Sequence, residues 1–303
     1  MTIVQLEYLV AVADHGSFSL ASIHCCVTQP SLSTQIKNLE EELGVVLIDR
    51  KDKPLSLTVI GKVVVEMARD AISKFYSLPN RVKEEQNEVA GELCLAVIPT
   101  IAPYMLHLFI PKFMKKYPNV KLTIRELFTR DIASSLKRGV VDIGLLAGGF
   151  VNPKEIEEET LYKDKFFLYV SDNSPLRGKK VVTVKDIDIE NLLLLADGHC
   201  LRSQVLDLCS NANSSGKSMN FESGSIETIV RMVGTSGGMT ILPEMATPFI
   251  REDRRNCILP FAKEIGASRD ITLAVAKNFY KKAIYKALKE EIIEMRKQQY
   301  FLI

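Results

Sequence analysis

The sequence predicts an all-α, winged helix-turn-helix unit at the N-terminus, followed by a long linker helix and a C-terminal α/β domain. Residues 1–58 contain three short helical patterns, and residues from 59 onward repeat an apolar side chain at steps of three and four. From Leu93 onward, apolar strand patterns alternate with helical ones, which is typical of α/β folds with largely parallel sheets. A chain of 303 residues also exceeds what one core usually holds.

Capping signals set the boundaries of the first helices. Thr2 and Gln5 form a T-x-x-Q capping box, and Gly16 ends the helix that follows. A short second helix precedes Thr28, which caps a third helix with Pro30 in its first turn. The third helix ends at Gly44, and residues 45–50 and 55–57 then predict a small β-wing.

The face of the third helix that is opposite its apolar stripe carries short hydrogen-bonding side chains rather than many charges. Such a surface suits a helix in the DNA major groove better than one in solvent. We expect these residues to contact the groove: Gln29, Pro30, Ser31, Ser33 and Thr34. Lys37 and Arg50 are expected on phosphates.

The linker helix is predicted to begin after Thr58 and to form a two-stranded coiled-coil seam. The seam consists of Val64, Met67, Ala71, Phe75 and Leu78. Pro79 is expected to break or kink the helix, and the polar stretch 81–92 to form a hinge. The alternative is a helix packed only on its own domain.

Seven strands are expected in the α/β domain. They are 93–98, 120–124, 141–146, 166–170, 192–195, 239–242 and 271–276. Thr100 follows the first of these strands at its carboxyl end, where open α/β sheets bind ligands, although capping a helix would explain it equally well.

Cys200 and Cys209 are the most informative pair in the chain. Cys200 follows an Asp-Gly turn signal and His199, with Arg202 two residues later, so a thiolate there is favoured by cations and by a helix N-terminus. A helix through Cys209 would separate the two thiols by roughly 13 Å along its axis, whereas a disulfide needs Cα atoms about 4.4–6.8 Å apart. The pair therefore predicts a redox switch that must unwind this helix, the alternative being two small core hydrophobes.

Composition excludes several classes of protein. No apolar run reaches the roughly 18 residues of a membrane span, and the N-terminus does not have the pattern of a signal peptide, so a cytoplasmic protein is expected. Six scattered cysteines indicate reduced cytosolic thiols, and no spacing indicates a metal or another cofactor. The net charge is only +2, and residues 1–62 hold five basic against seven acidic side chains, so DNA binding must depend on geometry.

The chain resembles the LysR-type transcriptional regulators over essentially its whole length. The motifs that carry the resemblance are Leu6-Glu7-Tyr8-Leu9, Gly16-Ser17-Phe18, Thr28-Gln29-Pro30-Ser31-Leu32-Ser33, Leu39-Glu40-Glu41-Glu42-Leu43-Gly44 and Leu57-Thr58…Gly61. Within that family, Asp197-Gly198-His199-Cys200-Leu201-Arg202 with Cys209 is similar to the OxyR-like, peroxide-sensing branch. Ser203 departs from it, because an acidic residue usually follows the arginine.

The resemblance implies how the fold and the chain are divided. It implies a periplasmic-binding-protein-like regulatory domain made of two Rossmann-like subdomains. The expected divisions are a DNA-binding domain at 1–58, a linker and hinge at 59–90, and a regulatory domain at 91–303. Subdomain I takes about 91–163 and 268–303, and subdomain II about 164–267.

The resemblance also implies the chemistry and the partners. Cys200 would be the peroxidatic cysteine and Cys209 the resolving one, with Thr100, Thr129, His199 and Arg202 binding hydrogen peroxide. Expected partners are promoter DNA with an inverted repeat, RNA polymerase, and further copies of the chain in a dimer through the linker helix and a homotetramer. The protein would be an activator of oxidative-stress genes and not an enzyme.

Two other functions remain open on the sequence. In one, the same scaffold responds to a small metabolite between the subdomains and the cysteines are incidental. In the other, the chain is a thiol peroxidase, which the N-terminal helix-turn-helix pattern disfavours. The other four cysteines (Cys25, Cys26, Cys94 and Cys257) and His15, His24 and His107 are expected to be structural or on the surface.

Overall fold

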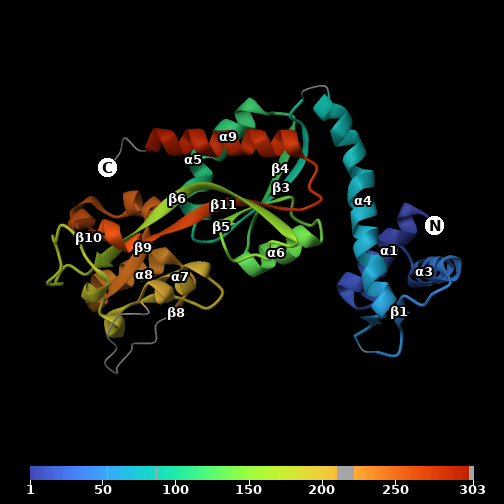
Figure 1. Ribbon diagram of the computed structural model, residues 1–303, viewed down its shortest axis with the longest axis horizontal. Helices are drawn as coiled ribbons and strands as arrows, with labels where there is room; N and C mark the ends of the chain where they lie inside the picture. The colour runs from blue at the N-terminus through green and yellow to red at the C-terminus, as the bar shows by residue number, and fades with distance from the viewer. Residues whose placement is uncertain (53, 86–87, 210–221, 300–303) are drawn as a thin grey trace. The chain divides into compact units, whose positions relative to one another are not determined.

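The computed structural model describes residues 1–303 apart from 53, 86–87, 210–221 and 300–303 (Figure 1). It separates into two compact units, Met1–Glu88 and Val89–Ile303. Among the described residues, no helix is long and apolar enough to pass through a lipid bilayer.

The first unit is a winged helix-turn-helix, as the sequence predicts. Its elements are α1 (Ile3–His15), α2 (Phe18–His24), α3 (Gln29–Leu43), β1 (Ile48–Asp49), β2 (Ser56–Leu57) and α4 (Val59–Glu85). Strands β1 and β2 pair antiparallel to form the wing. Leu9, Leu32, Ile36 and Leu39 are fully buried in the core between the helices.

The predicted caps are confirmed. The Thr2 hydroxyl accepts from the Gln5 backbone N–H at 3.3 Å, and the Gln5 side chain accepts from the Thr2 N–H at 2.8 Å. Gly16 and Gly44 end α1 and α3 with φ of 60° and 67°, a left-handed conformation that favours glycine. Local sequence chemistry therefore determines where the helices of this unit begin and end.

Of the two outcomes predicted for Pro79, a break is wrong, because α4 passes through Pro79 and continues to Glu85. A proline removes one N–H donor, and the backbone hydrogen bonds on either side can sustain the helix. The helix begins as predicted, with the Thr58 hydroxyl accepting from the Gly61 N–H at 2.9 Å. The expected hinge at 81–92 is therefore helical in its first part, while residues 86–87 lie outside the described residues.

The second unit is built on one mixed sheet. Its strand order is β10-β6-β11-β5-β3-β4, and β9 also pairs with β6. The strands of this unit are β3 (Gly91–Val97), β4 (Val120–Glu126), β5 (Ile143–Ala147), β6 (Ile156–Val170), β7 (Leu194–Leu195), β8 (Glu222–Ser223), β9 (Met239–Pro243), β10 (Ile258–Pro260) and β11 (Ser268–Ala276). A separate pair is formed by β7 and β8.

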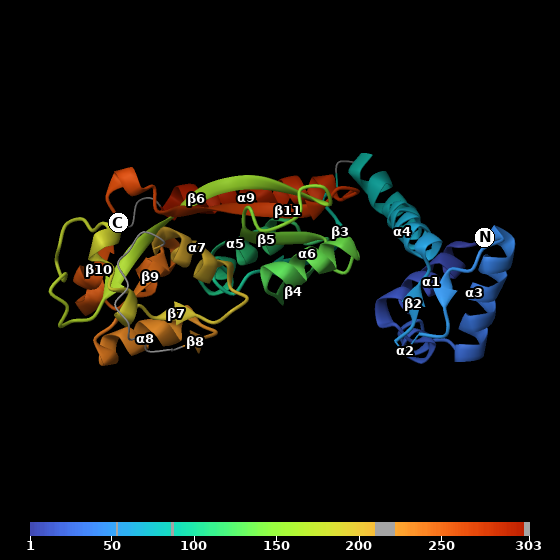
Figure 2. The ribbon, with the colours of Figure 1, turned by 60° about the horizontal axis from the view of Figure 1, so that its bottom comes forward.

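Strands β6 and β11 make the sheet less parallel than the sequence predicts. Strand β3 is parallel to β4 and β5, but β11 is antiparallel to β5 and β6, and β6 is antiparallel to β9 and β10. The first part of β6 pairs with β11, and its last residues, 166–170, pair with β9 (Figure 2). Strand β6 thus connects the part of the sheet around β11 with the part around β9 and β10.

Helices cover the sheet of the second unit. They are α5 (Ala102–Lys116), α6 (Thr129–Lys137), α7 (Cys200–Cys209), α8 (Ile226–Ser236) and α9 (Lys282–Gln299), with short 3-10 turns at Val184–Asp186, Ile189–Asn191, Glu244–Phe249, Glu252–Cys257 and Lys263–Ile265. Helices α5 and α9 lie on one face of the sheet and α6 on the other (Figure 1). Phe109, Phe113 and Tyr169 are among the largest fully buried side chains.

Candidate functional site

Helix α7 carries both cysteines of the predicted switch, Cys200 as its first residue and Cys209 as its last. The turn before it has Gly198 at φ 97°, a conformation that favours glycine. Nine helical steps separate the cysteines by about 13.5 Å along the axis and place them on opposite sides of the helix. Their side chains are 6% and 5% exposed. The expectation that one helix holds the thiols apart is confirmed.

Cys200 lines a small hollow in which both halves of the second unit meet. Thr100 follows β3, Thr129 begins α6, and His199 and Cys200 come from the start of α7. The hollow is closely packed and leaves no room for a sphere of water size. Its wall consists of Ile98, Pro99, Thr100, Phe128, Thr129, Gly198, His199 and Cys200. Three of the predicted peroxide-binding residues therefore lie around Cys200.

Several polar atoms in this wall are buried without a hydrogen-bond partner among the described residues. They are the Thr129 hydroxyl and both ring nitrogens of His199. Burial lowers the pKa of His199 below its usual value of 6.5, so the ring is neutral at pH 7 and offers one donor and one acceptor. Buried polar groups are nearly always paired in proteins, so these atoms are available for a small polar ligand.

A buried arginine that sequence reasoning missed positions Thr100. Arg269 donates from Nη1 to the Thr100 hydroxyl at 2.9 Å and from Nη2 to the Thr100 carbonyl at 3.2 Å. It also pairs with Asp164 at 3.0 Å, and both charged side chains are fully buried. Because the Thr100 hydroxyl accepts from Arg269, its own proton remains for donation elsewhere.

A signal for Arg269 was present in the sequence. Residues alternate between the faces of β11, so Arg269 shares a face with Ile271 and Leu273, which are completely buried. A charged side chain in register with core residues indicates a buried, paired group. Its partner Asp164, 105 residues away, could not be identified this way.

Arg202 is the predicted peroxide ligand that the structure places elsewhere. It donates from Nη1 to the Leu195 carbonyl at 2.8 Å, and its Nε lies 2.9 Å from the Asp197 carboxylate. Two helical steps turn its side chain about 200° away from that of Cys200. These contacts attach α7 to the segment that precedes it.

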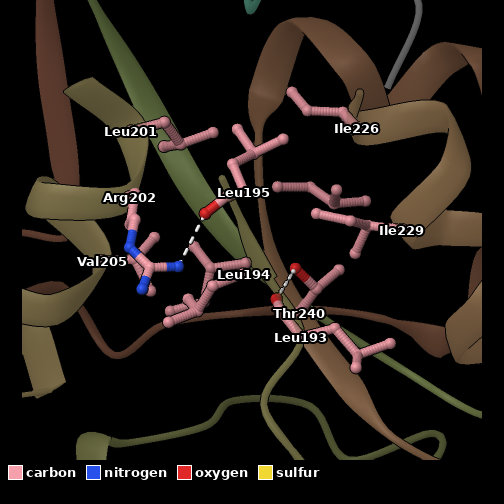
Figure 3. A pocket seen from close by; sticks show the side chains of 11 residues that line it. Leu193, Leu194, Leu195, Leu201, Arg202, Val205, Ile226, Ile229 and Thr240 are labelled. Carbon is pink, nitrogen blue, oxygen red and sulfur yellow. Dashed lines mark hydrogen bonds between the residues drawn. The ribbon is translucent and has the colours of Figure 1, made fainter. Parts of the chain in front are cut away.

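The Arg202 side chain lines a second, small cavity of about 10 Å³ beneath α7 (Figure 3). The other lining side chains are almost all apolar and come from α7, α8, β9 and the segment around β7. They include Leu201 and Val205, one helical turn apart on α7. The side chains beneath α7 thus nearly fill this space.

In the first unit, the predicted DNA-binding residues lie on one exposed or half-buried face of α3, with Arg50 on the wing. Gln29 accepts from the Ser19 hydroxyl at 3.0 Å, and Thr34 donates to the Pro30 carbonyl at 2.8 Å. Arg50 is paired with Glu40 at 3.1 Å. The exposed set on α3 is Gln29, Pro30, Ser31, Thr34 and Lys37, and Ser33 is half-buried.

Helix α4 has two different apolar faces. Val65 and Ala68 are buried in the core of the first unit, whereas Met67, Phe75 and Leu78 are 66%, 50% and 60% exposed. Of the remaining predicted seam residues, Ala71 is exposed and Val64 half-buried. The helix therefore packs on its own unit and still presents an apolar row to solvent.

The remaining cysteines are all unbonded thiols. Cys25 caps the C-terminal end of α2 and Cys26 follows it at φ 55°, so both lie in the turn after the helix. Cys257 is completely buried, and Cys94 is half-buried in β3. Within the described ranges, no cluster of three or more His, Cys, Asp or Glu side chains is placed to hold a metal ion.

Family models match both units of the chain. Residues 3–62 match the bacterial regulatory helix-turn-helix protein of the lysR family, and residues 86–296 match the LysR substrate binding domain. Together these matches cover most of the sequence.

Curated relatives and solved structures show the same similarity. The hydrogen peroxide-inducible genes activator of Pectobacterium carotovorum is 35% identical over 266 residues, covering 87% of this chain and 86% of the relative. The DNA-binding transcriptional dual regulator OxyR of Escherichia coli K12 is 34% identical over 264 residues, covering 87% and 86%.

Two solved structures extend over nearly the whole chain. A full-length OxyR variant from Pseudomonas aeruginosa aligns with a TM-score of 0.77 and 28% identity, covering 96% of this chain and 94% of that one. A hydrogen-peroxide-bound OxyR mutant from Corynebacterium glutamicum aligns with a TM-score of 0.65 and 26% identity, covering 98% and 93%.

Proposed function

The chain belongs to the LysR family of bacterial transcriptional regulators, and on this premise we propose that it senses hydrogen peroxide through Cys200 and activates oxidative-stress defence genes. The observation that carries the proposal is the hollow in which Cys200 meets unpaired polar atoms of Thr129 and His199. Relatives named as peroxide-inducible gene activators support the biological role. The expected location is the cytosol.

The size of the hollow favours peroxide over a metabolite. Small-molecule sites usually occupy about 300–1,000 Å³, whereas the hollow around Cys200 is too closely packed to leave room for a sphere of water size. Hydrogen peroxide has two heavy atoms and needs only a few hydrogen bonds to hold it. A metabolite-responsive regulator with incidental cysteines therefore fits this site less well.

The first chemical step is oxidation of Cys200. Its thiolate attacks one peroxide oxygen, the S–O bond forms and the O–O bond breaks, and a proton converts the departing hydroxide to water. Sulfur loses two electrons and peroxide gains them. His199, Thr129 and Thr100 are positioned to hydrogen-bond the oxygens as charge develops on the leaving group.

The second step requires α7 to open. The Cys209 sulfur attacks the sulfenic sulfur, the S–S bond forms, the S–O bond breaks and water leaves. Because the helix holds the two cysteines about 13.5 Å apart along its axis, it must unwind before they meet. We infer that this unwinding changes the regulatory domain and, through the oligomer, the contacts with DNA and RNA polymerase.

Intact-protein mass spectrometry and DNA footprinting test the proposed peroxide switch. After one equivalent of peroxide, the intact protein should lose about two mass units for a disulfide, whereas Cys209→Ser should gain about 16 for a sulfenic acid. Reduced and oxidised protein should give different footprints on the protein's own promoter. A footprint that is identical in both states would reject the proposed switch.

We further propose that α3 enters the major groove. Replacing Gln29 or Ser33 with alanine should erode discrimination between sites, because each good base contact is worth about 1–3 kcal/mol. Lys37→Ala should instead weaken binding to all sequences and reduce the salt dependence by about one unit of slope. Binding titrations on operator and scrambled DNA at several salt concentrations separate these effects. Equal, sequence-blind losses in all three variants would exclude the assignment.

The exposed row on α4 is proposed as the dimer seam, with tetramers formed by further contacts. Introducing glutamate at Met67 and Ala71 together should yield monomers, because two charges would be buried against the partner helix. Light scattering measures this directly. Lys62→Glu is the matched control. It changes the net charge by the same two units, but on the other side of α4 from Met67 and Ala71. A dimer that persists in the double variant rules out the seam.

A further inference from the structure

Phe128 is the most exposed large side chain in the wall around Cys200. Thr100, Thr129, His199 and Cys200 are 2%, 6%, 4% and 6% exposed, whereas Phe128 is 38% exposed. Gly198 is also exposed, and Pro99 is half-buried. The wall therefore reaches the surface where Phe128 and Gly198 lie side by side.

The Phe128 ring lies against Gly198 and His199, the two residues that precede Cys200. It stands edge-on to the His199 ring, with centroids 4.8 Å apart and an interplanar angle of 85°. A Cβ on Gly198 would lie 3.8 Å from the Phe128 ring, in ordinary van der Waals contact. Since Phe128 precedes α6 while Gly198 and His199 precede Cys200 on α7, one aromatic ring closes the junction between the two halves of the unit.

We propose that Phe128 closes the mouth of the hollow and makes Cys200 selective for hydrogen peroxide over bulky organic hydroperoxides. The inference rests on the proposed function, because it concerns the oxidant that reaches Cys200. In hydrogen peroxide, the second oxygen carries only hydrogen. In an alkyl hydroperoxide it carries a carbon substituent, which must extend from the hollow toward solvent, where the Phe128 ring lies.

The reaction of Cys200 with an alkyl hydroperoxide is the same two-electron oxidation as its reaction with hydrogen peroxide. The Cys200 thiolate would bond to the terminal oxygen of the hydroperoxide, the O–O bond would break, and the alkoxide would take a proton and leave as an alcohol. Selectivity therefore depends on access and not on the chemistry of sulfur. A pocket discriminates against extra bulk by about 10- to 200-fold for each group of methylene size.

The Phe128 side chain can be changed without removing the start of α6. The Phe128 carbonyl accepts from the Asp131 and Ile132 N–H groups, both at 2.9 Å, and these bonds do not involve the ring. The ring is more than one-third exposed, so its loss removes little core packing. Phe128→Ala should fold, and Phe128→Leu provides a matched variant that keeps an apolar cover.

The test measures the rate of sulfenic acid formation at Cys200 with hydrogen peroxide and with cumene hydroperoxide, in the full chain carrying Cys209→Ser. In Phe128→Ala, the ratio of the cumene hydroperoxide rate to the hydrogen peroxide rate should rise at least about tenfold. Phe128→Leu should stay near the parent value. Water reaching the ring in Phe128→Ala should also raise the pKa of His199 toward 6.5, as followed by NMR.

The outcomes separate this proposal from the proposed function. A parent protein that reacts with hydrogen peroxide, but whose selectivity is unchanged in Phe128→Ala, overturns the role of Phe128 alone. If sulfenic acid forms in the parent protein at equal rates with both oxidants, the role of Phe128 in selectivity is also overturned. A parent protein whose Cys200 reacts with neither oxidant overturns the proposed function and, with it, the selectivity built upon it.

Discussion

Cys200→Ser is expected to abolish the response to peroxide, so that DNA footprints with and without micromolar peroxide become identical. A serine hydroxyl is not appreciably ionised at neutral pH and does not form the sulfenic acid from which the disulfide is made. The substitution preserves size and leaves Thr100, Thr129 and His199 in place, so the reduced protein should still fold and bind DNA. Circular dichroism and DNA affinity of the reduced variant check this.

Serine substitutions at other cysteines provide the controls for this prediction. Cys94 and Cys257 lie outside the wall around Cys200, and Cys25 and Cys26 belong to the first unit. Changing any of these four should leave the response intact. If Cys200→Ser still switches its footprint with micromolar peroxide, the cysteine mechanism is wrong and the metabolite-responsive alternative gains support.

Arg269→Met should produce the largest loss of stability among the single substitutions considered. It leaves the Asp164 carboxylate fully buried without its cation, which typically costs about 3–5 kcal/mol of unfolding free energy. It also removes both hydrogen bonds to Thr100. Urea unfolding gives the stability, and sulfenic acid formation at Cys200 gives the effect on the site.

The double variant Arg269→Met with Asp164→Asn distinguishes stability from function. The asparagine has no charge and can still accept from the Met245 N–H, so most of the stability should return. Thr100 remains without its donors in the double variant. Oxidation of Cys200 should therefore stay about 10- to 100-fold slow. Recovery of both stability and rate would mean that Arg269 does not position Thr100.

The parts of the fold that the sequence predicted well depend on local chemistry. The capping box of Thr2 and Gln5 and the glycines after α1 and α3 act within a few residues, so they can be identified without the fold. Helix α7 was predictable for the same reason, because Gly198 and the apolar spacing after Cys200 are local signals. The separation of Cys200 from Cys209 then followed from helical geometry.

The parts that it missed depend on distant partners. Strand β6 begins at Ile156, ten residues before the predicted start, because its Glu-rich first part is not a recognisable strand by itself. There, Glu159 pairs with Lys289 of α9. Arg269 is buried only because Asp164 lies beside it. The peroxide-binding role of Arg202 was assigned from its place in the motif around Cys200, whereas helical rotation directs its side chain to Leu195 and Asp197.

Burial of Cys209 fixes the order of events in time. It raises the pKa of this thiol to about 11, so at pH 7 only about one molecule in ten thousand carries a Cys209 thiolate. Disulfides from outside, such as oxidised glutathione, need a thiolate to begin exchange. They cannot enter the cycle at Cys209 while α7 is intact. In the proposed switch, a slow change in the cell's thiol balance would therefore not act through Cys209, and an oxidant that reaches Cys200 would start the reaction.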